Sequence, residues 1–456
     1  MEKEYKSRTK FWKGVLVGAL ITAFAGLIIV GVASGISLIG RTVIDNQAQS
    51  QIMENTDGSA QVRQELDMDK IAAKLETFQE IINEYYLFGE DMEKVETGIY
   101  KGMLAGLEDP YTVYYTPEEF QSLTEETEGV YCGIGVLVSQ NMETGMITAL
   151  RVFKGSPAEE AGMKKGDIFY KVGDLEASAE ELDVLVQNHI RGEEGTTVDI
   201  TVIRDGEEIP MTIERRIVET TTVEGQMLDE ETGYILVTQF ELVTGDQFRE
   251  MVEDLEEQGM KRLVIDLRDN PGGVLDSCVE IAAYLLPDDQ HDGTILSTSD
   301  KYGRGVRYYS AGGEICYEEN GEEGRDPRYP KKDEHQLDIP MTVLVNENSA
   351  SAAEVLAGAL RDYDRARLVG TTTFGKGIVQ SLLPLDDGSA VKVTIAHYYT
   401  PSGFDLHKKG LEPDILVEPE EPDPDEISYG KYDDVSVETD NQLRAAIEAM
   451  ESESSN

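Results

Sequence analysis

The longest apolar segment lies near the start of the chain and carries no charge. It reads GVLVGALITAFAGLIIVGVASGISLIG and lies between Lys13 and Arg41. An uncharged helix of this length spans a bilayer core of about 30 Å, so we predict a transmembrane helix over residues 14–40. A cleaved signal peptide is the alternative, but the apolar run is too long for one and no small-residue cleavage site precedes its polar end. The segment before it, residues 1–13, is basic and the segment after it is acidic, which predicts that the rest of the chain lies outside the cytoplasm.

Two helical patterns follow a polar stretch that we interpret as a linker over residues 41–66. Apolar residues recur there at intervals of three and four, first around Phe78 and again around Ile99, which predicts two amphipathic helices. The second helix is expected to end at Asp109, because a residue that precedes a proline is disfavoured in a helix. A further helix is expected to begin at the sequence TPEE, after Thr116.

Alternating short runs predict a β-rich module in the middle of the chain and an α/β core after it. Runs such as TVDITVIRD alternate apolar and polar residues, and one helix-like run, AEELDVLVQNHI, interrupts them. Farther on, strand patterns such as RLVIDL and TVLVN alternate with helix patterns such as SAAEVLAGALRDY, which is typical of an α/β sheet. The predicted segments are a cytoplasmic tail over 1–13, a transmembrane helix over 14–40, a linker over 41–66, a helical region over 67–128, a β-rich module over 129–217, an α/β core over 218–418 with an aperiodic surface insertion at 300–338, and an acidic tail with one helix over 419–456.

Composition narrows the classes of partner and the means of stabilisation. The chain has 89 acidic and 40 basic residues, a formal net charge of −49 over 456 residues. Such a surface repels phosphate backbones, so we expect no nucleic-acid partner. The three cysteines, Cys132, Cys278 and Cys316, are far apart in the sequence and do not indicate a disulfide framework.

The junction MTVLVNENSASAAEVLAGAL places Ser351 where a strand pattern gives way to a helix pattern. By itself this segment is more typical of a plain helix cap, since Ser351 and Glu354 fit a capping box. A helix N-terminus also presents free backbone N–H groups and a positive potential, however, which is where an activated serine and an oxyanion are best placed. Ser351 is therefore a candidate nucleophile.

The segment GTTTFGKGIVQ contains a lysine between two glycines, Lys376. It nearly fits a phosphate-binding loop, but Gly377 stands where that loop has Ser or Thr, and a strand pattern follows where that loop needs a helix. The alternative is a lysine whose apolar surroundings, such as Phe374 and Ile378, favour its neutral form. A lysine pKa near 7 requires a shift of about 3 units, worth roughly 4 kcal/mol. Lys376 is accordingly a candidate general base.

A glycine turn in LVIDLRDNPGGVLDSC offers the groups of an oxyanion hole. On its own it is more typical of a simple strand-to-helix connection. Gly272 and Gly273 also leave their backbone N–H groups accessible to a reacting carbonyl, and the N–H of Ala352 is the second candidate donor. The chain has no GxSxG, HExxH or CxxC motif, so histidine-based and zinc-based hydrolysis are disfavoured and no metal site is predicted.

Several segments, in their order along the chain, resemble the carboxyl-terminal processing (tail-specific) peptidases. They are EDPYTVYYTPEEF, KGSPAEEAGMKKGDIFYKVGD, LRDNPGG, NSASAAE, TTFGKGIVQ, YYTPSGF and GLEPDI. The resemblance implies Ser351 as nucleophile, Lys376 as base and Gln380 as a residue that assists the lysine. Ala353 departs from the family, which often has a serine there. A straight strand would separate Lys376 from Gln380 by about 13 Å, so their contact needs a bend after Gly377.

The resemblance further implies an N-terminal helical region, an inserted PDZ domain and an α/β core related to the crotonase (ClpP and enoyl-hydratase) architecture. It predicts a serine endopeptidase, anchored in the cell membrane by a single span with its catalytic part outside the cytoplasm, that cleaves proteins near their C-termini without metal or cofactor. The expected partners are proteins or peptides with free apolar C-termini, and the sequence leaves open whether the chain forms a homo-oligomer. The rival hypothesis is a catalytically silent PDZ scaffold that binds extracellular protein tails.

PDZ domains add an extended peptide to a sheet edge and hold its carboxylate in a nest of backbone N–H groups. The candidate nest here is Gly133, Ile134 and Gly135, where the glycines permit the turn and Ile134 would line an apolar pocket. The helix AEELDVLVQNHI would form the other wall. The alternative is that these three residues are only a tight turn that leads into the strand GVLVSQ.

Overall fold

The computed structural model describes residues 65–89, 91–141, 144–287, 291–329, 337–420 and 435–453. The predicted membrane span at 14–40 lies outside these residues. None of the helices that the structure describes is both long enough and apolar enough to cross a bilayer. The chain divides into two compact units, Met1–Leu107 and Glu108–Asn456, and each is described by itself.

The first unit contains the two amphipathic helices that the sequence predicts. Helix α2 (Met68–Tyr85) and helix α3 (Met92–Ala105) both begin after an aspartate. Asp67 accepts a hydrogen bond from the Lys70 N–H at 3.0 Å, and Asp91 accepts one from the Lys94 N–H at 3.3 Å. These side chains satisfy backbone donors that a helix start leaves unpaired.

The second unit begins with a turn, the short strand β1 (Val113–Tyr115) and helix α4 (Pro117–Glu128). The helix starts with a capping box, in which Thr116 and Glu119 exchange backbone and side-chain hydrogen bonds of 3.0 and 3.3 Å. The carboxylate of Asp109 accepts from the Tyr111 N–H at 3.0 Å and from the Thr112 hydroxyl at 2.6 Å, which fixes the turn before β1.

The predicted β-rich module is a five-stranded antiparallel path, β3-β4-β5-β7-β8, with β6 paired to β5. Its core is a cluster of buried apolar side chains that includes Ile147, Phe169 and Ile200. A separate antiparallel pair, β2 and β9, joins the two ends of the module. Its elements are β2 (Val130–Gly133), β3 (Val136–Gln140), β4 (Ile147–Val152), α5 (Pro157–Glu160), β5 (Ile168–Val172), β6 (Leu175–Glu176), η1 (Ala177–Ala179), α6 (Leu182–Leu185), η2 (Val186–Ile190), β7 (Thr197–Arg204), β8 (Glu207–Glu214) and β9 (Arg216–Glu219).

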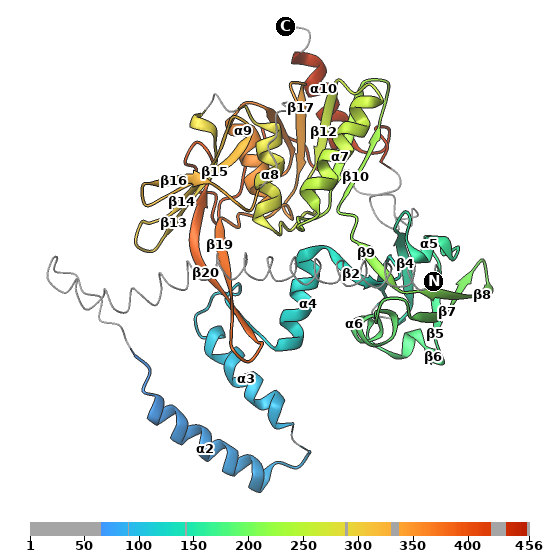
Figure 1. The fold of residues 1–456 in the computed structure, drawn as a ribbon, viewed down its shortest axis with the longest axis vertical. Helices are drawn as coiled ribbons and strands as arrows, with labels where there is room; N and C mark the ends of the chain where they lie inside the picture. The colour runs from blue at the N-terminus through green and yellow to red at the C-terminus, as the bar shows by residue number, and fades with distance from the viewer. Residues whose placement is uncertain are drawn as a thin grey trace, which may run out of the picture. The chain divides into compact units, whose positions relative to one another are not determined.

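The α/β core is built on a sheet of order β10-β11-β12-β17-β18-β21, parallel except for β10 (Figure 1). Side chains alternate between its faces, so Leu263 and Ile265 join the cluster under α7, α8 and α9, while Val264 joins the cluster under α10. The elements are β10 (Val223–Met227), β11 (Thr232–Val237), α7 (Thr244–Glu257), β12 (Arg262–Asp266), α8 (Leu275–Leu285), β17 (Met341–Val345), α9 (Ala352–Asp362), β18 (Ala366–Gly370), β21 (Ile415–Leu416) and α10 (Asn441–Glu453).

A second sheet adds β1, β13 to β16, β19 and β20 to this unit. Residues 300 to 338 were expected to be an aperiodic insertion, but the structure forms hairpins from β14, β15 and β16 there. Most side chains of β14 and β15 are half-buried on both faces, so the strands lack the apolar–polar alternation that would have predicted them. The bounds are β13 (Thr294–Asp300), β14 (Val306–Ala311), β15 (Glu314–Glu319), β16 (Glu322–Arg325), β19 (Ile378–Pro384) and β20 (Ala390–Tyr399), with η3 (His291–Gly293) before β13.

Candidate active site

Ser351 lies at the point where the chain leaves the parallel sheet after β17 and enters helix α9. Its backbone is left-handed, with φ +56 and ψ −117. A residue with a side chain pays a strain energy for such a conformation, and such strain is concentrated at functional sites. The side chain is half-buried, whereas the whole of α9 from Ala352 to Leu360 is buried. The fold therefore holds this serine in a fixed, strained position at a helix N-terminus.

The carboxylate of Glu354, in the first turn of α9, connects Ser351 to the segment that carries Lys376. It accepts from the N–H groups of Ser351 at 3.0 Å and Lys376 at 2.8 Å, both on Oε2. It also accepts on Oε1 from the Gly375 N–H at 2.7 Å and from the Thr373 hydroxyl at 2.5 Å. Burial raises the pKa of Glu354, although the four hydrogen bonds favour its charged form.

The shared oxygen sets an upper limit on the separation of the two candidate catalytic residues. Because the Ser351 and Lys376 N–H groups both donate to Oε2, their nitrogens lie within about 6 Å of each other, the most that bonds of 3.0 and 2.8 Å allow. Tyr398, on β20, provides a second link, since its buried hydroxyl lies 3.0 Å from the Ser351 carbonyl and 2.7 Å from the Lys376 carbonyl. The structure thus brings together two residues that the sequence keeps apart.

The environment of Lys376 holds its pKa below the ordinary value. Burial lowers the pKa of Lys376, the positive charge of Lys392 lowers it further, and Glu354 opposes both. Its Nζ lies 4.8 Å from the centre of the Tyr111 ring, in the turn before β1. Among the described residues it forms no hydrogen bond to the Ser351 hydroxyl. The Lys376 amine therefore lies against the face of the Tyr111 ring and is not hydrogen-bonded to the Ser351 hydroxyl.

Gln380 follows Lys376 on β19, where the pairing with β20 shifts register between Val379 and Gln380. The shift is a local irregularity of the kind expected if the strand has to bend. The side-chain amide of Gln380 donates to the Ile378 carbonyl at 3.3 Å, and no hydrogen bond to Lys376 is formed within the described part of the chain. The role of Gln380 stays a prediction.

The glycine turn lies directly against Ser351. A Cβ on Gly272 would come within 2.7 Å of the Ser351 Cβ and 2.9 Å of the Ala352 nitrogen, so only glycine fits there. The Gly272 N–H donates to the Asn270 side chain at 2.8 Å and is engaged in this structure. The N–H groups of Gly273 and Ala352 donate to no other described residue, so these two are the available candidates for an oxyanion hole.

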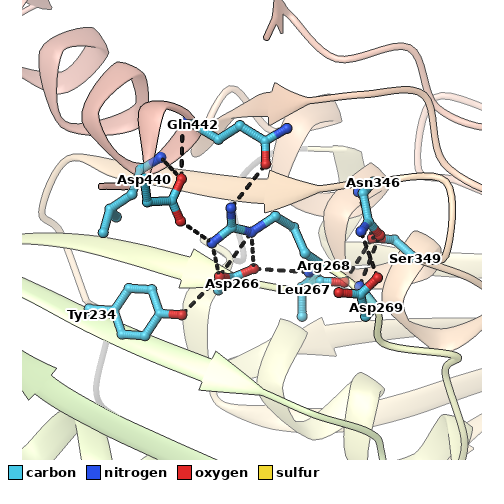
Figure 2. Close-up of polar contacts among 10 residues, drawn as sticks. Tyr234, Asp266, Leu267, Arg268, Asp269, Asn346, Ser349, Asp440 and Gln442 are labelled. Carbon is cyan, nitrogen blue, oxygen red and sulfur yellow. Dashed lines mark hydrogen bonds and ion pairs between the residues drawn. The ribbon is translucent and has the colours of Figure 1, made fainter. Parts of the chain in front are cut away.

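Ser349, the other serine of the segment NSASAAE, has a structural role. It is fully buried, its hydroxyl donates to the Leu267 carbonyl at 2.7 Å, and its oxygen accepts from the Asn346 N–H at 2.9 Å. Figure 2 shows it beside Asn346 and Asp269. The Ser349 hydroxyl is therefore not available as a nucleophile.

The predicted carboxylate nest lies where β2 ends and β3 begins. Gly135 has φ +78, a conformation that favours glycine, and a Cβ there would contact Ser156. The ring of Tyr131 packs on Gly133, where a Cβ would come within 2.7 Å of it. Ile134 is only 1% exposed and belongs to the core of the module, so it does not line an open pocket in this structure.

Strand β3 is at one end of the strand order of the module, with β4 as its partner. The helix predicted for the segment AEELDVLVQNHI is a short α-helix, α6, that continues as the π-helical turn η2. The side chain of Gln140 connects the two elements, because it accepts from the Leu182 N–H at 3.0 Å and donates to the Glu180 carbonyl at 2.9 Å. The arrangement of an edge strand beside a helix suits the addition of a peptide strand.

Three contributors to the site were missed from the sequence. Glu354 was interpreted only as a cap, although a glutamate in a buried helix turn needs more partners than one backbone N–H. Tyr111 lies in the segment EDPYTVYYTPEEF, and Tyr398 is the first residue of the segment YYTPSGF. Nothing in the sequence shows that these tyrosines contact Lys376 and Ser351. Their contacts depend on strand pairings between distant segments.

Replacing Glu354 by Gln should destabilise the protein by about 3 kcal/mol, because the amide would place an NH₂ group against buried donors. Urea denaturation measures this loss, and hydrogen exchange should show faster exchange at the N–H groups of Gly375 and Lys376. The matched control is Glu347→Gln, since Glu347 accepts an exposed hydrogen bond from the Thr371 hydroxyl at 3.1 Å. Equal stability of the two variants would contradict the structural role of Glu354.

Comparison with known proteins assigns three parts of the chain. Residues 231–417 match the model of peptidase family S41, residues 132–214 match the PDZ domain, and residues 28–119 match the model described as the activating protease CtpB N-terminal domain. The expected PDZ domain and N-terminal helices are confirmed by these matches.

Two curated relatives cover most of the chain. A carboxyl-terminal-processing protease of Synechocystis sp. is 35% identical over 69% of each chain. A probable CtpA-like serine protease of Staphylococcus aureus is 33% identical over 76% of this chain and 64% of its own length. Among solved structures, a photosystem II D1 C-terminal processing protease is 27% identical and covers 75% of this chain and 86% of its own, with a TM-score of 0.40. The 35% identity to the Synechocystis protease over 69% of each chain, together with a family match over the segment that holds Ser351, Glu354 and Lys376, shows that the chain belongs to peptidase family S41, as a serine peptidase related to the carboxyl-terminal processing proteases.

Proposed function

We propose that this peptidase cleaves proteins near their C-termini, with Ser351 as nucleophile and neutral Lys376 as general base. The observation that supports this most is the single Glu354 oxygen that binds the backbones of both residues. Burial and the charge of Lys392 support the base role, since both lower the pKa of Lys376. The engaged hydroxyl of Ser349 leaves Ser351 as the serine for the reaction.

In the proposed reaction, Lys376 leaves the face of Tyr111 and accepts the proton of the Ser351 hydroxyl. The serine oxygen bonds to the substrate carbonyl carbon, and the N–H groups of Gly273 and Ala352 stabilise the oxyanion. Gly272 would join them if its bond to Asn270 opened. The C–N bond then breaks, the lysine returns its proton to the leaving amine, and water hydrolyses the acyl-enzyme by the same route. Since an aromatic face stabilises the charged form of lysine, departure from Tyr111 favours the neutral base.

The PDZ domain supports a role in choosing substrates. The left-handed Gly135 and the edge strand β3 are the features of this module that suit capture of a C-terminal tail. The substrates that fit this mode are unstructured proteins or peptides with free apolar C-termini.

The proposal also includes the membrane tether and the crotonase relationship of the core. The apolar, uncharged sequence at 14–40 and the basic residues before it support a single span with the peptidase outside the cytoplasm. The alternation of parallel strands with α7, α8 and α9 supports an α/β core of the kind that the crotonase relationship implies.

Replacing Ser351 by Ala should abolish cleavage of a peptide substrate and change the free energy of unfolding by less than about 1 kcal/mol, because Glu354 still binds the backbone there. Lys376→Arg should be equally inactive, because the guanidinium of an arginine is not deprotonated in proteins and so cannot accept the serine proton. Peptide cleavage and urea denaturation, measured on the same preparations, check both statements.

The matched control is Ser349→Ala, which removes a buried hydrogen bond and so should lower stability while leaving measurable cleavage. Full cleavage by Ser351→Ala together with an inactive Ser349→Ala would show that Ser351 is not the nucleophile. Peptide binding without cleavage by the wild type would favour the silent scaffold.

Amidating the C-terminus of an apolar-tailed peptide should weaken its cleavage, because a neutral amide loses the carboxylate's charge-assisted hydrogen bonds to the nest. The free-acid and amidated forms are compared by kcat/KM on the wild type and on Gly135→Ala, whose side chain would strain the nest. Gly135→Ala should reduce the difference between the two peptides. Identical kcat/KM values for both peptides on the wild type would show that the PDZ domain does not read the carboxylate.

A further inference from the structure

The C-terminal helix α10 lies beyond residues 231–417, which the family model matches. It packs on the sheet face opposite α9 through buried side chains that include Leu443, Ala446 and Met450. The segment that was expected to be an acidic tail with one helix therefore adds a helical layer, α10, to the α/β core. Its N-terminal end contacts the segment that leads to the glycine turn.

Arg268 makes that contact from a position two residues after the end of β12 and immediately before Asp269. Its guanidinium binds both oxygens of Asp266, with distances of 3.0 and 2.6 Å, and Oδ2 of Asp440 at 2.7 Å. It also donates to the Gln442 side chain at 2.9 Å. Figure 2 shows Arg268 between Asp266 on one side and Asp440 and Gln442 of the C-terminal segment on the other. The Arg268 side chain is only 9% exposed, so these partners satisfy a buried charge.

Asp440 has two functions that can be separated. Its Oδ1 accepts from the N–H groups of Gln442 at 3.0 Å and Leu443 at 2.9 Å, and so caps α10. Its Oδ2 binds Arg268. Burial disfavours the charged form of Asp440, but the hydrogen bond and charge of Arg268 outweigh it and hold the pKa below its ordinary value.

The segment after Arg268 is fixed at its other side by the loop that carries Ser351. Asp269 has a left-handed backbone with φ +61, and its carboxylate accepts from the side-chain amides of Asn346 and Asn348 at 2.8 Å each. The Asn270 carbonyl accepts from the Ala350 N–H at 2.9 Å. Arg268 and these loop contacts thus hold the two ends of one short connection, from which Gly272 and Gly273 follow.

We propose that Asp440 is a positioning residue for catalysis, which acts through Arg268 to hold the glycine turn against Ser351. The C-terminal helix is then part of the catalytic apparatus, although it makes no contact with the reacting atoms. The inference rests on the proposed function, in which this turn supplies an oxyanion donor. Displacement of such a donor affects the transition state more than substrate binding, so kcat should fall while KM changes little.

A second ion pair provides a matched control at the other end of the same helix and strand. Arg262 begins β12, and its Nη1 lies 3.0 Å from Oε1 of Glu451 near the end of α10. Breaking this pair weakens the attachment of α10 to β12 without touching the glycine turn. A purely structural role for α10 predicts the same kinetic effect from either end.

The experiment compares Asp440→Asn with Glu451→Gln on the full chain. Asparagine retains the helix cap but not the charge, so the Arg268 bond is weakened selectively. We expect Asp440→Asn to lower kcat about tenfold or more with KM within about twofold, and Glu451→Gln to leave kcat within about twofold of wild type. Asp440→Glu, which restores the charge, should recover part of the lost kcat. Thermal denaturation reports whether the two single changes cost similar stability.

The kinetics of these variants decide whether Asp440 positions the glycine turn. Equal loss of kcat in Asp440→Asn and Glu451→Gln, or wild-type kcat in Asp440→Asn, would overturn the positioning role. Ser351→Ala, assayed beside them, tests the proposed function by itself: if it cleaves, the proposed function fails. An inactive Ser351→Ala with a fully active Asp440→Asn would overturn only this inference.

Discussion

A buried carboxylate with four donors is the constraint on which the candidate site depends. Glu354 is fully buried, and a charge in that position is tolerated only because Ser351, Thr373, Gly375 and Lys376 all donate to it. Movement of either segment away from the other would leave that charge without its partners. Glu354 therefore holds the start of α9 and the segment 373–376 together, because separating them would leave its buried charge without hydrogen-bond donors.

The same carboxylate creates an electrostatic conflict at the base. Its negative charge raises the pKa of Lys376, whereas catalysis needs the neutral amine. Burial of Lys376 and the positive charge of Lys392 act in the opposite direction and outweigh it. Lys392 thus offsets the effect of the Glu354 charge on the pKa of Lys376, while the Lys376 amine lies against the aromatic ring of Tyr111.

Sequence patterns predicted the parts of this structure that local rules determine. The helices α2, α3 and α9, the β-rich module and the parallel core follow from periodicity. Motifs at marked junctions singled out Ser351 and Lys376, whose catalytic roles stay predictions. The strands β14 to β16 were missed because their half-buried side chains do not alternate. The Glu354 network, the stored position of Lys376 and the contact of α10 with Arg268 were not predictable, since each depends on segments that only the folded sheets bring together.

The pH dependence of Ser351 acylation tests the central claim most directly. The rate of labelling by a fluorophosphonate, located on Ser351 by mass spectrometry, should rise with pH through the folded-state pKa of Lys376, because only the neutral amine accepts the serine proton. Lys392→Gln removes a repelling charge, so Lys376 should keep its proton to higher pH and the rising part of the profile should shift upward. A profile that is unchanged in Lys392→Gln, or one that does not rise with pH, would contradict the assignment of Lys376 as the base.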